Sequence, residues 1–514
     1  MPGLSKSKYT KFCQCDKALW LKTYKPELEV IDDATKARFE MGNVVGDLAM
    51  GLFGDYKEAH AEKADGQLDL VTMTAQTKQW MDDGVENICE ASFIYDSNYC
   101  AVDILRKTDD GWAIYEVKSS TYPEFKGRPS EIEKYAPDIA YQKWLLTQCG
   151  VNVTGTFLVC LNSDYVRQGE LDLQKLFVII DMQGMVANEL LKVPNNVTLA
   201  KATMAKTEEP DTDLDTHCHV PYDCGFWTYC SRHLPKPSVF DVYGGKGRGG
   251  FTFAKKVDCY KNGKMTFEDL RGESIGAIQD LQIGCMLDHR EHIDLEEIGK
   301  FLSELSYPLY FLDFESMQDA VPQYDNTKPY TQLCFQYSLH IKASEDAPYQ
   351  HKEFLAPSDG SDPRRALAEQ LCRDIPMGAC TVVYNKTFEC TRLKEMAAIF
   401  PDLSAHLMDI HDHIKDLLVP FQSGHFYLLA MGKSFSIKSV LPALFPDEPT
   451  LNYHNLDTRV QNGGDAMTIF PRIKDMTADE AAATREALLR YCELDTWAMV
   501  KVWERLCEEA CQNP

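Results

Sequence analysis

The sequence predicts an α/β protein, in which strands and helices alternate within each of two main domains. Two strand-like runs, residues 98–107 and 112–119, are joined by a turn and followed by a helical pattern that begins near Asp138. A buried strand over residues 309–312 opens a second alternation, which ends in a long helical pattern over residues 478–508. The chain has 514 residues, which leaves room for about two to four domain cores.

Two changes in composition divide the chain. The cysteine-rich stretch 218–230 is followed by Pro-Lys-Pro at residues 235–237 and by a glycine-rich run, and glycine and proline at this density indicate a boundary or a flexible connection. A new strand-like pattern starts after Pro308. We therefore expect an N-terminal domain of residues 1–240, a connector of residues 241–305 and a C-terminal domain of residues 306–514.

The composition excludes several classes of protein. The net charge of −25 argues against a protein that coats nucleic acid non-specifically, because phosphate binding leaves a basic footprint. No apolar run approaches the roughly 20 residues of a membrane-spanning helix, and the first residues lack the apolar stretch of a secretory signal. We therefore expect a cytoplasmic protein with no membrane partner. In that compartment its 18 cysteines fill cores or bind metal and do not form disulfides.

The first candidate centre lies on the hairpin over residues 98–119. The turn contains Asp110-Gly111, and Asp-Gly between two apolar runs favours a tight hairpin. Such a turn places Asp103 opposite Glu116, or opposite Lys118 if its centre shifts by one residue. Because Glu116 and Lys118 are two residues apart, they project from the same face of their strand.

Two carboxylates and an ammonium group at one end of a hairpin have a chemical use. Asp103 and Glu116 can hold Mg²⁺ or Mn²⁺, which prefer oxygen ligands, while Lys118 orients a water molecule or stabilises charge on a phosphate. The alternative is an exposed cross-strand ion pair, which contributes little to stability.

Asp103 followed by Glu116-Val-Lys118 resembles the signature of PD-(D/E)XK nucleases, in the form found in RecB-family and CRISPR-adaptation nucleases. The helical pattern that begins at Asp138 is similar to the glutamine motif of that family, with Gln142 in the matching position. The resemblance implies a restriction-endonuclease-like domain. It also implies a catalytic set of Asp103, Glu116, Lys118 and Gln142, with the two acids as metal ligands.

The chain departs from that family at one position. The family's first, helical motif often carries a metal-ligating histidine after a glycine and two or three apolar residues. Here the run Gly42-Asn-Val-Val-Gly46 has glycine at the histidine position. One metal ligand is therefore absent from the expected place.

A cysteine near the N-terminus and three more about two hundred residues later form a separate pattern. Cys13 and Cys15 are the two N-terminal candidates, and the arrangement resembles iron–sulfur members of the same nuclease family, including AddB-type proteins. The Lys-Ala-Leu-Trp-Leu that follows the second of them is similar to the helix after the first ligand in that family, which favours Cys15. The resemblance implies a [4Fe–4S] cluster that staples the domain, with the ligands Cys15, Cys218, Cys224 and Cys230. Zinc is the alternative metal, with His217 and His219 as extra ligands, although the spacing lacks the Cys-x2-Cys knuckles typical of zinc.

The second candidate centre combines a strand with a distant helix. The buried strand from Leu309 ends in Asp313-Phe-Glu315, and residues two apart share a face, so both carboxylates can bind one metal. Tyr491 and Asp495 are four residues apart on the long C-terminal helical pattern and therefore lie one turn apart on one face. A phenol beside a carboxylate can orient an attacking water.

The ordered set of Asp313-Phe-Glu315, Asn385-x-x-Phe-Glu389 and Tyr491-x-x-x-Asp495 resembles the DEDDy group of DnaQ-like 3′→5′ exonucleases, which have a ribonuclease H-like, mixed-sheet fold. The resemblance implies two-metal hydrolysis. Asp313 and Asp495 are then ligands, Glu315 is a ligand or water activator, and Tyr491 orients the water. Glu389 stands where the family has aspartate, and Asp409 is an alternative ligand.

As a whole, the chain resembles a bacterial family catalogued as a domain of unknown function, in which an iron–sulfur RecB-like nuclease domain precedes a DnaQ-like exonuclease domain. The resemblance implies a metal-dependent nuclease with two centres that uses Mg²⁺ or Mn²⁺ to hydrolyse phosphodiester bonds. Nucleic acid is the expected partner, with DNA favoured over RNA. Two alternatives remain open: an RNA 3′-end exonuclease, and a nucleic-acid-binding or redox-sensing scaffold whose N-terminal centre is inactive.

Overall fold

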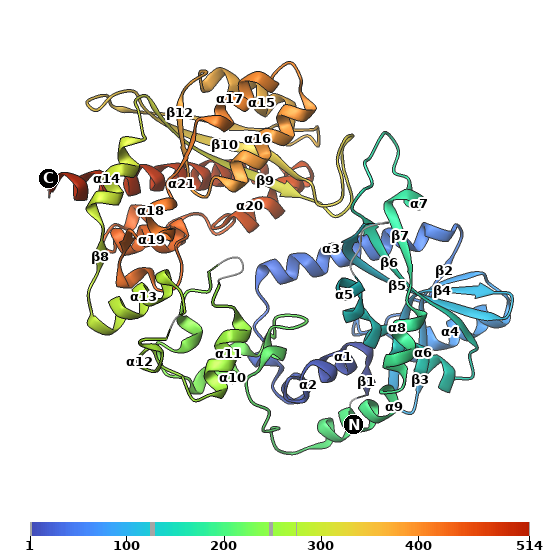
Figure 1. The fold of residues 1–514 in the computed structure, drawn as a ribbon. Helices are drawn as coiled ribbons and strands as arrows, with labels where there is room; N and C mark the ends of the chain where they lie inside the picture. The colour runs from blue at the N-terminus through green and yellow to red at the C-terminus, as the bar shows by residue number, and fades with distance from the viewer. Residues whose placement is uncertain (1–2, 124–128, 246–249, 274, 513–514) are drawn as a thin grey trace. The chain divides into compact units, whose positions relative to one another are not determined.

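A computed structural model describes residues 3–123, 129–245, 250–273 and 275–512. The chain forms a mixed α/β structure (Figure 1) with two compact units. Unit 1 comprises Met1–His233 with Asp319–Thr331, and unit 2 comprises Leu234–Gln318 with Gln332–Pro514. The chain therefore passes between the units near residue 233, and the loop 319–331 belongs to unit 1 although both of its flanking strands belong to unit 2. Most of the expected connector, 241–305, consists of helices of unit 2, and its residues 246–249 and 274 lie outside the described part of the chain.

Unit 1 is built on a mixed seven-stranded sheet with the order β2-β3-β4-β5-β6-β7, and β1 pairs with β4. β3, β4 and β5 form an antiparallel meander, whereas β5 and β6 are parallel. The strands are β1 (Leu4–Ser5), β2 (Lys57–Glu58), β3 (Asn87–Tyr95), β4 (Asn98–Thr108), β5 (Gly111–Tyr122), β6 (Val153–Asn162) and β7 (Phe177–Asp181).

Helices and buried apolar side chains cover both faces of this sheet. One core cluster contains Ile139 and Leu145 of α6, and the opposite cluster contains Val45 and Ala49 of α3. The helices are α1 (Lys6–Gln14), α2 (Asp16–Tyr24), α3 (Asp33–Met50), α4 (Leu70–Asp82), α5 (Pro129–Ile132), α6 (Ala136–Gln148), α7 (Leu173–Leu176), α8 (Gln183–Leu190), α9 (Val193–Ala205) and α10 (Trp227–Cys230).

The β4–β5 hairpin has the tight turn that its sequence predicts. Thr108 pairs with Gly111, so the loop has two residues, and the register continues to Ile104 and Tyr115. Glycine is required at 111 because a Cβ atom there would lie 2.3 Å from the backbone oxygen of Asn152. This register sets the positions of the acidic residues further along both strands.

Unit 2 is built on a mixed five-stranded sheet with the order β11-β10-β9-β12-β13. β9 pairs antiparallel with β10 and parallel with β12. The strands of this sheet and of a small two-stranded sheet are β8 (His292–Ile293), β9 (Leu309–Gln318), β10 (Gln332–Lys342), β11 (Tyr349–Leu355), β12 (Cys380–Val383), β13 (Ile414–Asp416) and β14 (Phe426–Tyr427).

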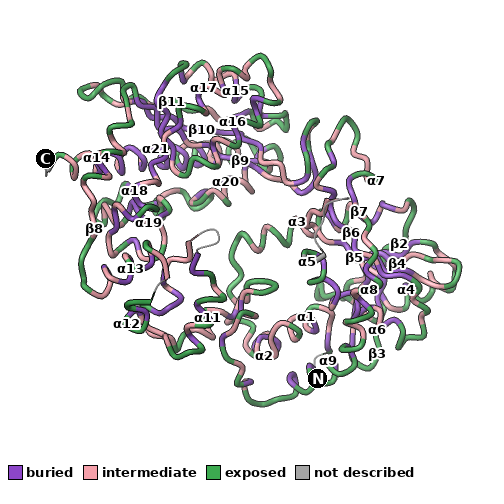
Figure 2. Tube along the Cα trace, viewed as in Figure 1, coloured by how far each residue is buried: buried purple, intermediate pink, exposed green. Residues whose placement is uncertain are grey.

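The two faces of the unit 2 sheet carry different helices (Figure 1). Alternate residues of β9, including Leu312 and Phe314, pack with α15, α16 and α17 in one apolar core, which is buried in Figure 2. The residues between them point to the face that α21 covers. The helices are α11 (Phe253–Lys261), α12 (Phe267–Leu270), α13 (Ala277–Asp288), α14 (Leu295–Ser303), α15 (Arg364–Asp374), α16 (Thr387–Ile399), α17 (Ser404–Asp412), α18 (Val419–Gln422), α19 (Ile437–Leu444), α20 (Gly463–Ile469) and α21 (Ala478–Gln512).

Among the described residues, none of the helices combines the length and the apolar composition that a membrane span requires.

Candidate metal centres

The β4–β5 hairpin gathers the three expected residues at one end of the unit 1 sheet. The register places Asp103 beside Glu116, the first of the two expected alternatives, and Asp103 Oδ2 accepts a hydrogen bond from Val117 N at 2.7 Å. Lys118 Nζ donates to Glu116 and also, at 3.0 Å, to Asp138 Oδ2. Glu116 is fully buried, so its charge depends on these partners.

Helix α6 adds two polar side chains to this centre. Gln142 Nε2 donates to Glu116 Oε2 at 2.7 Å, so the expected glutamine contacts one of the expected carboxylates. Asp138 lies one helical turn before it, on the same face. Gln142 Oε1 and Asp138 Oδ1 are both buried without a hydrogen-bond partner, and buried acceptors of this kind suit a bound cation.

Lys6, which sequence reasoning missed, lies in the middle of the carboxylates. It is the first residue of α1, and its Nζ lies 3.1 Å from both oxygens of Glu116. The same atom lies 3.7 Å from Asp103 Oδ1 and 3.9 Å from Asp138 Oδ1. Its ammonium group thus takes the position between three acids that a divalent cation would need.

Two further positions bear on the missing histidine of the first motif. Gly46 lies within α3, and a Cβ atom there would meet nothing within 4 Å, so this position supplies no ligand. Glu90 lies opposite Asp103 in the β3–β4 register, with a φ of 51° that is uncommon for a residue other than glycine. Glu90 is therefore a fourth carboxylate at this centre, and no spacing in the sequence pointed to it.

The protonation equilibria of unit 1 follow from burial and from the two lysines. Burial and the charge of Glu116 raise the pKa of Asp103 above its usual range. Burial alone would raise the pKa of Glu116 too, but the charges of Lys118 and Lys6 hold it well below normal. Burial and Asp103 raise the pKa of Glu90 to about 7. Burial and the charge of Glu116 also raise the pKa of Asp138. Glu116 is therefore the permanent anion of the group, and Asp103, Asp138 and Glu90 are the acids that titrate.

In unit 2, β9 and α21 bring together four of the five expected residues. The side chains of Asp313 and Glu315 project from β9 on the face that α21 covers. Tyr491 and Asp495 lie one turn apart on α21. Glu315, Tyr491 and Asp495 are all buried. Charge interactions link Asp313 to both Asp495 and Glu315, so acids from distant parts of the chain share one site.

Lys438 and Tyr453, also missed by sequence reasoning, complete this centre. Lys438 Nζ of α19 donates to Tyr491 Oη at 3.1 Å and lies over the rings of both tyrosines. Tyr453 Oη donates to Asp495 Oδ1 at 2.6 Å. These contacts orient the phenol and the carboxylate that the resemblance singles out.

Cys492 and Gly463 form the remaining wall of the unit 2 centre. Ligand atoms of Asp313, Glu315 and Cys492 all lie within 4.8 Å of one another. A Cβ atom at Gly463 would lie 3.7 Å from Glu315 Oε2 and 4.0 Å from Tyr491 Oη. A side chain at this position would therefore be in van der Waals contact with both groups.

Glu389 lies at the start of α16 and is 97% buried, with Oε2 lacking a hydrogen-bond partner. Burial and the charge of Asp416 raise the pKa of Glu389 to about 8. Asp416 itself accepts hydrogen bonds from the backbone of Asn385 and Lys386, and so holds the loop before α16. Asp409, the alternative ligand, instead accepts a hydrogen bond from Gly378 N at 2.6 Å.

The negative charges of the unit 2 carboxylates are poorly compensated by positive charges. Burial and then the charge of Asp495 raise the pKa of Asp313 and of Glu315 well above their usual values. Burial also raises the pKa of Asp495, although hydrogen bonds from the tyrosines oppose it. A single lysine, Lys438, faces these acids among the groups that shift their pKa values. Such a cluster needs bound protons or bound cations.

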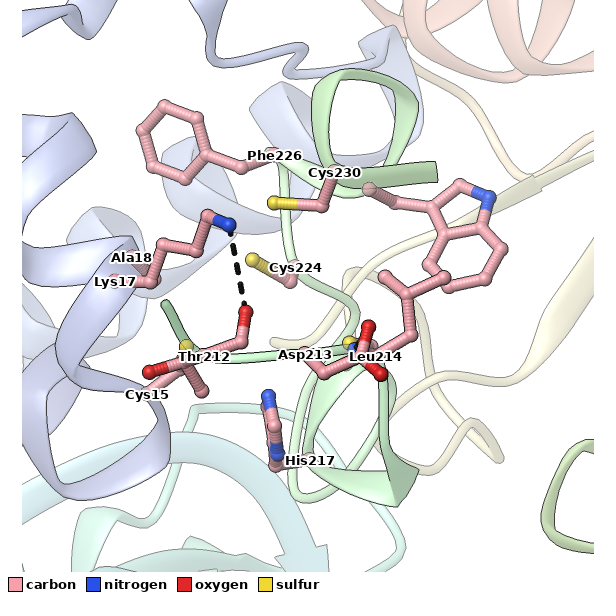
Figure 3. A pocket seen from close by; sticks show the side chains of 12 residues that line it. Cys15, Lys17, Ala18, Thr212, Asp213, Leu214, His217, Cys224, Phe226 and Cys230 are labelled. Atoms are coloured by element: carbon pink, nitrogen blue, oxygen red, sulfur yellow. Dashed lines mark hydrogen bonds between the residues drawn. The ribbon is translucent and has the colours of Figure 1, made fainter. Parts of the chain in front are cut away.

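The four expected cysteines line one pocket of unit 1 (Figure 3), where the sulfur atoms of Cys224 and Cys230 point into the same space. All four are free thiols. Phe226, Ala18 and Trp20 form the apolar core beside them. The pocket therefore combines soft ligands with a largely apolar wall.

The spacing of the sulfur atoms distinguishes between metals. A tetrahedral zinc site with Zn–S bonds of about 2.3 Å places its sulfurs about 3.8 Å apart, whereas a cubane cluster holds them further apart. Among the described residues, no three of these thiols and of the nitrogens of His217 and His219 have ligand atoms within 4.8 Å of one another. Charge interactions nevertheless link Cys224 to each of the other three cysteines. The four thiols therefore lie near one another, and the structure holds them in one pocket.

Comparison with known families gives one match. Residues 310–436 match the family described as "Domain of unknown function (DUF2779)". The matched segment contains Asp313, Glu315 and Glu389 but ends before α21, which carries Tyr491 and Asp495.

Two curated relatives are similar over part of the chain. "Uncharacterized protein UU173" of Ureaplasma parvum serovar 3 is 30% identical over 234 residues, which are 40% of this chain and 32% of the relative. "Uncharacterized protein MG366 homolog" of Mycoplasma pneumoniae is 26% identical over 205 residues, 37% of this chain and 31% of the relative. The matches thus span about a third of each relative's length. One solved structure, "Crystal structure of SSO0001", is 14% identical and covers 46% of this chain and 88% of its own, with a TM-score of 0.24 that is too low to identify a shared fold.

Proposed function

We propose that this protein is a metal-dependent nuclease with one hydrolytic centre in each unit, and that it degrades DNA from a 3′ end. The observation that carries the proposal is the convergence of Asp313 and Glu315 from β9 with Tyr491 and Asp495 from α21 in one buried, poorly compensated acidic site. Acids arranged in this way are expensive to bury unless cations hold them. Unit 2 is then a DnaQ-like, ribonuclease H-type exonuclease domain.

In unit 2 each side chain has a separate task. Asp313, Glu315 and Asp495 would hold Mg²⁺ or Mn²⁺, and those ions would stabilise charge on the attacking and leaving oxygens of a phosphodiester. Tyr491 offers its hydroxyl to a water or phosphate oxygen, and the bond from Lys438 fixes its position. Tyr453 holds Asp495 in place from the other side. Glu389 holds a proton near neutral pH and releases it when a cation approaches.

In unit 1 we assign a PD-(D/E)XK-type centre to Asp103, Glu116, Lys118 and Gln142. Asp103 and Glu116 would hold a divalent cation, with Gln142 Oε1 as a further oxygen ligand. Lys118 is kept charged because Asp138 and Glu116 outweigh the effect of burial and raise its pKa well above normal. It therefore acts as a fixed positive charge for a phosphate and not as a base. Glu90, whose pKa Asp103 helps to raise, would supply a further carboxylate in place of the histidine that Gly46 does not provide.

We assign the four cysteines to a [4Fe–4S] cluster. When bound, the cluster would act as a covalent tie between the N-terminal helices and the segment 218–230. Within this chain, burial raises the pKa of Cys15 to about 11 and that of Cys230 to about 11, so assembly of the cluster must release protons from these thiols. The backbone of Lys17 and Ala18 donates to Cys15 and favours its thiolate form.

The test uses end-labelled single-stranded DNA and RNA with Mn²⁺ and four proteins: the wild type, Asp313→Asn, Lys118→Ala and the double variant. The proposal expects shortening from the 3′ end in the wild type, loss of one activity in each single variant and of both in the double variant. Cleavage that persists in the double variant would reject both centres. Faster degradation of RNA than of DNA would favour the RNA 3′-end alternative.

A second candidate for unit 1 is a nucleic-acid-binding scaffold whose centre no longer reacts. The position of Lys6 favours it, because an ammonium group between three carboxylates replaces a cation without supplying its Lewis acidity. Under this alternative Lys118→Ala leaves all cleavage intact, whereas the two-centre proposal expects a loss.

Replacement of Lys6 by methionine is expected to strengthen Mn²⁺ binding in unit 1 by about tenfold or more, because the variant removes a competing charge at roughly 3–4 Å, worth at least about 1.4 kcal/mol. Mn²⁺ is titrated by electron paramagnetic resonance of the free ion, in an Asp313→Asn background that weakens the unit 2 centre. Lys8→Met is the matched control, since Lys8 is partly exposed and its Nζ donates to the Gly3 carbonyl oxygen at 3.3 Å. Unchanged or weaker binding in Lys6→Met would contradict the assigned position of the cation.

Binding of Mn²⁺ to unit 1 is expected to strengthen with rising pH. Burial and Glu116 raise the pKa of Asp103, so the carboxyl is protonated up to a higher pH than usual and must lose its proton to bind a cation. The affinity should rise about tenfold per pH unit below that pKa, and less steeply above it until Glu90, whose pKa is raised to about 7, is also ionised. The same titration from pH 5 to pH 8 shows this slope in the wild-type centre and a flatter one in Asp103→Asn. An equal slope in both proteins would mean that a group other than Asp103 causes the pH dependence of Mn²⁺ binding. Asp109→Asn, in the hairpin turn, is the control.

A further inference from the structure

Two histidines and a glutamate meet on the unit 2 sheet, as a group distinct from Asp313, Glu315 and Cys492. His340 of β10 and His351 of β11 are directly opposite each other in the antiparallel register, with ring centroids 4.6 Å apart and planes inclined by 30°. Glu493 of α21 faces the pair, and its Oε1 lies 3.9 Å from His351 Nδ1. One ligand atom from each of the three residues lies within 4.8 Å of the other two.

Two hydroxyl groups anchor the imidazole rings. His340 Nδ1 lies 2.8 Å from Thr496 Oγ1, and His351 Nε2 lies 2.9 Å from Ser338 Oγ. The two hydroxyl oxygens are 2.7 Å apart. Each ring is therefore held through one nitrogen, which is the usual way that proteins orient a histidine that ligates metal with its other nitrogen.

The hydrogen bonds determine where the protons are. Thr496 Oγ1 donates its one proton to the Glu493 carbonyl oxygen at 3.1 Å, so it must accept from both Ser338 and His340. Ser338 has then used its proton and must accept from His351 Nε2. Both rings are consequently protonated on the anchored nitrogens, which leaves lone pairs on His340 Nε2 and His351 Nδ1. The second of these is the atom that faces Glu493.

We propose that His340, His351 and Glu493 form a zinc-type transition-metal site that ties α21 to the β10–β11 edge of the sheet. Two imidazole nitrogens and one carboxylate oxygen suit Zn²⁺, whereas Mg²⁺ prefers oxygen ligands alone. β11 is the edge strand, and the Glu493 side chain is 49% exposed, so an ion can enter from solvent. His340 is buried and forms the inner end of the site.

The site has a structural consequence for α21. Along α21, Glu493 lies between Tyr491 and Asp495, and Thr496 follows Asp495. Glu493 and Thr496 project from a different face of the helix than Tyr491 and Asp495. An ion held by Glu493 and by the two strands would fix the rotation of this turn of the helix. The proposal rests on the contacts of its own residues, and it holds whether or not the acidic centre is hydrolytic.

The test titrates the full-length, chelator-treated protein with Co²⁺ as a spectroscopic probe and compares the wild type with His351→Gln and Glu493→Gln. Nitrogen and oxygen ligands give visible d–d bands without the intense sulfur-to-cobalt charge transfer of a cysteine site. We expect one such Co²⁺ per chain in the wild type, displaced by Zn²⁺, with binding at least about 100-fold weaker in each variant. Thr496→Val, which removes one anchor, should weaken binding roughly 10–100-fold.

Glu493→Gln changes an exposed side chain, so the comparison remains valid even if the histidine variant folds poorly. His413→Gln on the same unit is the matched control and should bind like the wild type. The proposal is overturned if the wild type shows no nitrogen–oxygen band. It is equally overturned if Glu493→Gln and Thr496→Val bind Co²⁺ with wild-type spectrum and affinity, because the ion would then lie elsewhere and His351 would be a simple ion-pair partner of Glu493.

Discussion

Asp313→Asn is expected to lower the rate of 3′-end shortening by unit 2 roughly 10³-fold or more. The substitution keeps the shape of the side chain but removes one of the negative charges shared by Asp313, Glu315 and Asp495, and the loss of one transition-state-stabilising group commonly costs 10²–10³-fold or more. The measurement is kcat/KM on end-labelled DNA with Mn²⁺, in a Lys118→Ala background that removes the unit 1 contribution.

The same substitution is expected to stabilise the protein in the absence of metal. Burial first and then the charge of Asp495 raise the pKa of Asp313, so the ionised form of Asp313 opposes folding. The free energy of unfolding of the wild type therefore falls as the pH rises through that pKa. Asparagine carries no charge and avoids this loss. A thermal melt with chelator should therefore give a Tm equal to or above that of the wild type. Activity loss with an unchanged or raised Tm cannot come from unfolding.

Asp412→Asn is the matched control, because Asp412 lies on α17 with its side chain 67% exposed and contacts His411. It should retain wild-type activity. Full activity in Asp313→Asn would place the chemistry of unit 2 outside this centre. Recovery of activity at higher Mn²⁺ would instead show that asparagine still binds the ion weakly.

Local patterns in the sequence predicted the elements that carry the candidate sites. The strand from Leu309, the hairpin at Asp110-Gly111 and the C-terminal helix lie within a few residues of their expected bounds. Alternation within β9 was sufficient to predict that Asp313 and Glu315 share a face. These features depend on near neighbours in the chain, which is why periodicity could identify them.

Groups from elements with no sequence relation to the centres could not be predicted. Lys6 and Lys438 come from helices that pack on the sheets by tertiary contacts, and a lone lysine carries no pattern. Glu90 faces Asp103 only because of the β3–β4 register, which no local turn signal specified. The position of Asp138, by contrast, was predictable from the sequence, because Asp138 lies one helical turn from Gln142 on the same face.

The same distinction explains the units. Residues 241–305 have no sequence motif, yet most of the described ones fold as helices of unit 2, because amphipathic faces such as that of α14 need a partner to cover them. The loop 319–331 belongs to unit 1 through contacts such as the bond from Tyr330 Oη to the Ser119 carbonyl oxygen at 2.7 Å. The compositional shifts near Pro237 and Pro308 are local features of the sequence, whereas long-range contacts define a unit.

Cys224→Ala is expected to remove the iron–sulfur cluster and to lower the Tm of unit 1 by roughly 10 °C. Cys224 is the cysteine whose charge acts on all three of the others, so its loss opens the centre of the ligand set. A tie that closes a loop of about 200 residues contributes on the order of 4–5 kcal/mol, and each kcal/mol shifts the Tm of a domain this size by about 2–4 °C. Iron and sulfide content, visible absorbance that dithionite bleaches, and thermal melts measure the effect.

Cys13→Ala is the matched control, since Cys13 lies two residues before Cys15 but is exposed, with a contact to Asn196. It should keep its iron, its colour and its Tm, because its sulfur does not line the pocket. A wild-type protein that is colourless and carries a zinc ion that Cys224→Ala loses would reject the cluster and require the thiols to close by more than an ångström. If Cys13→Ala and Cys224→Ala lost iron and Tm equally, the pocket would tolerate neither change for reasons of packing. The assignment of Cys15, Cys218, Cys224 and Cys230 as the ligands would then be rejected.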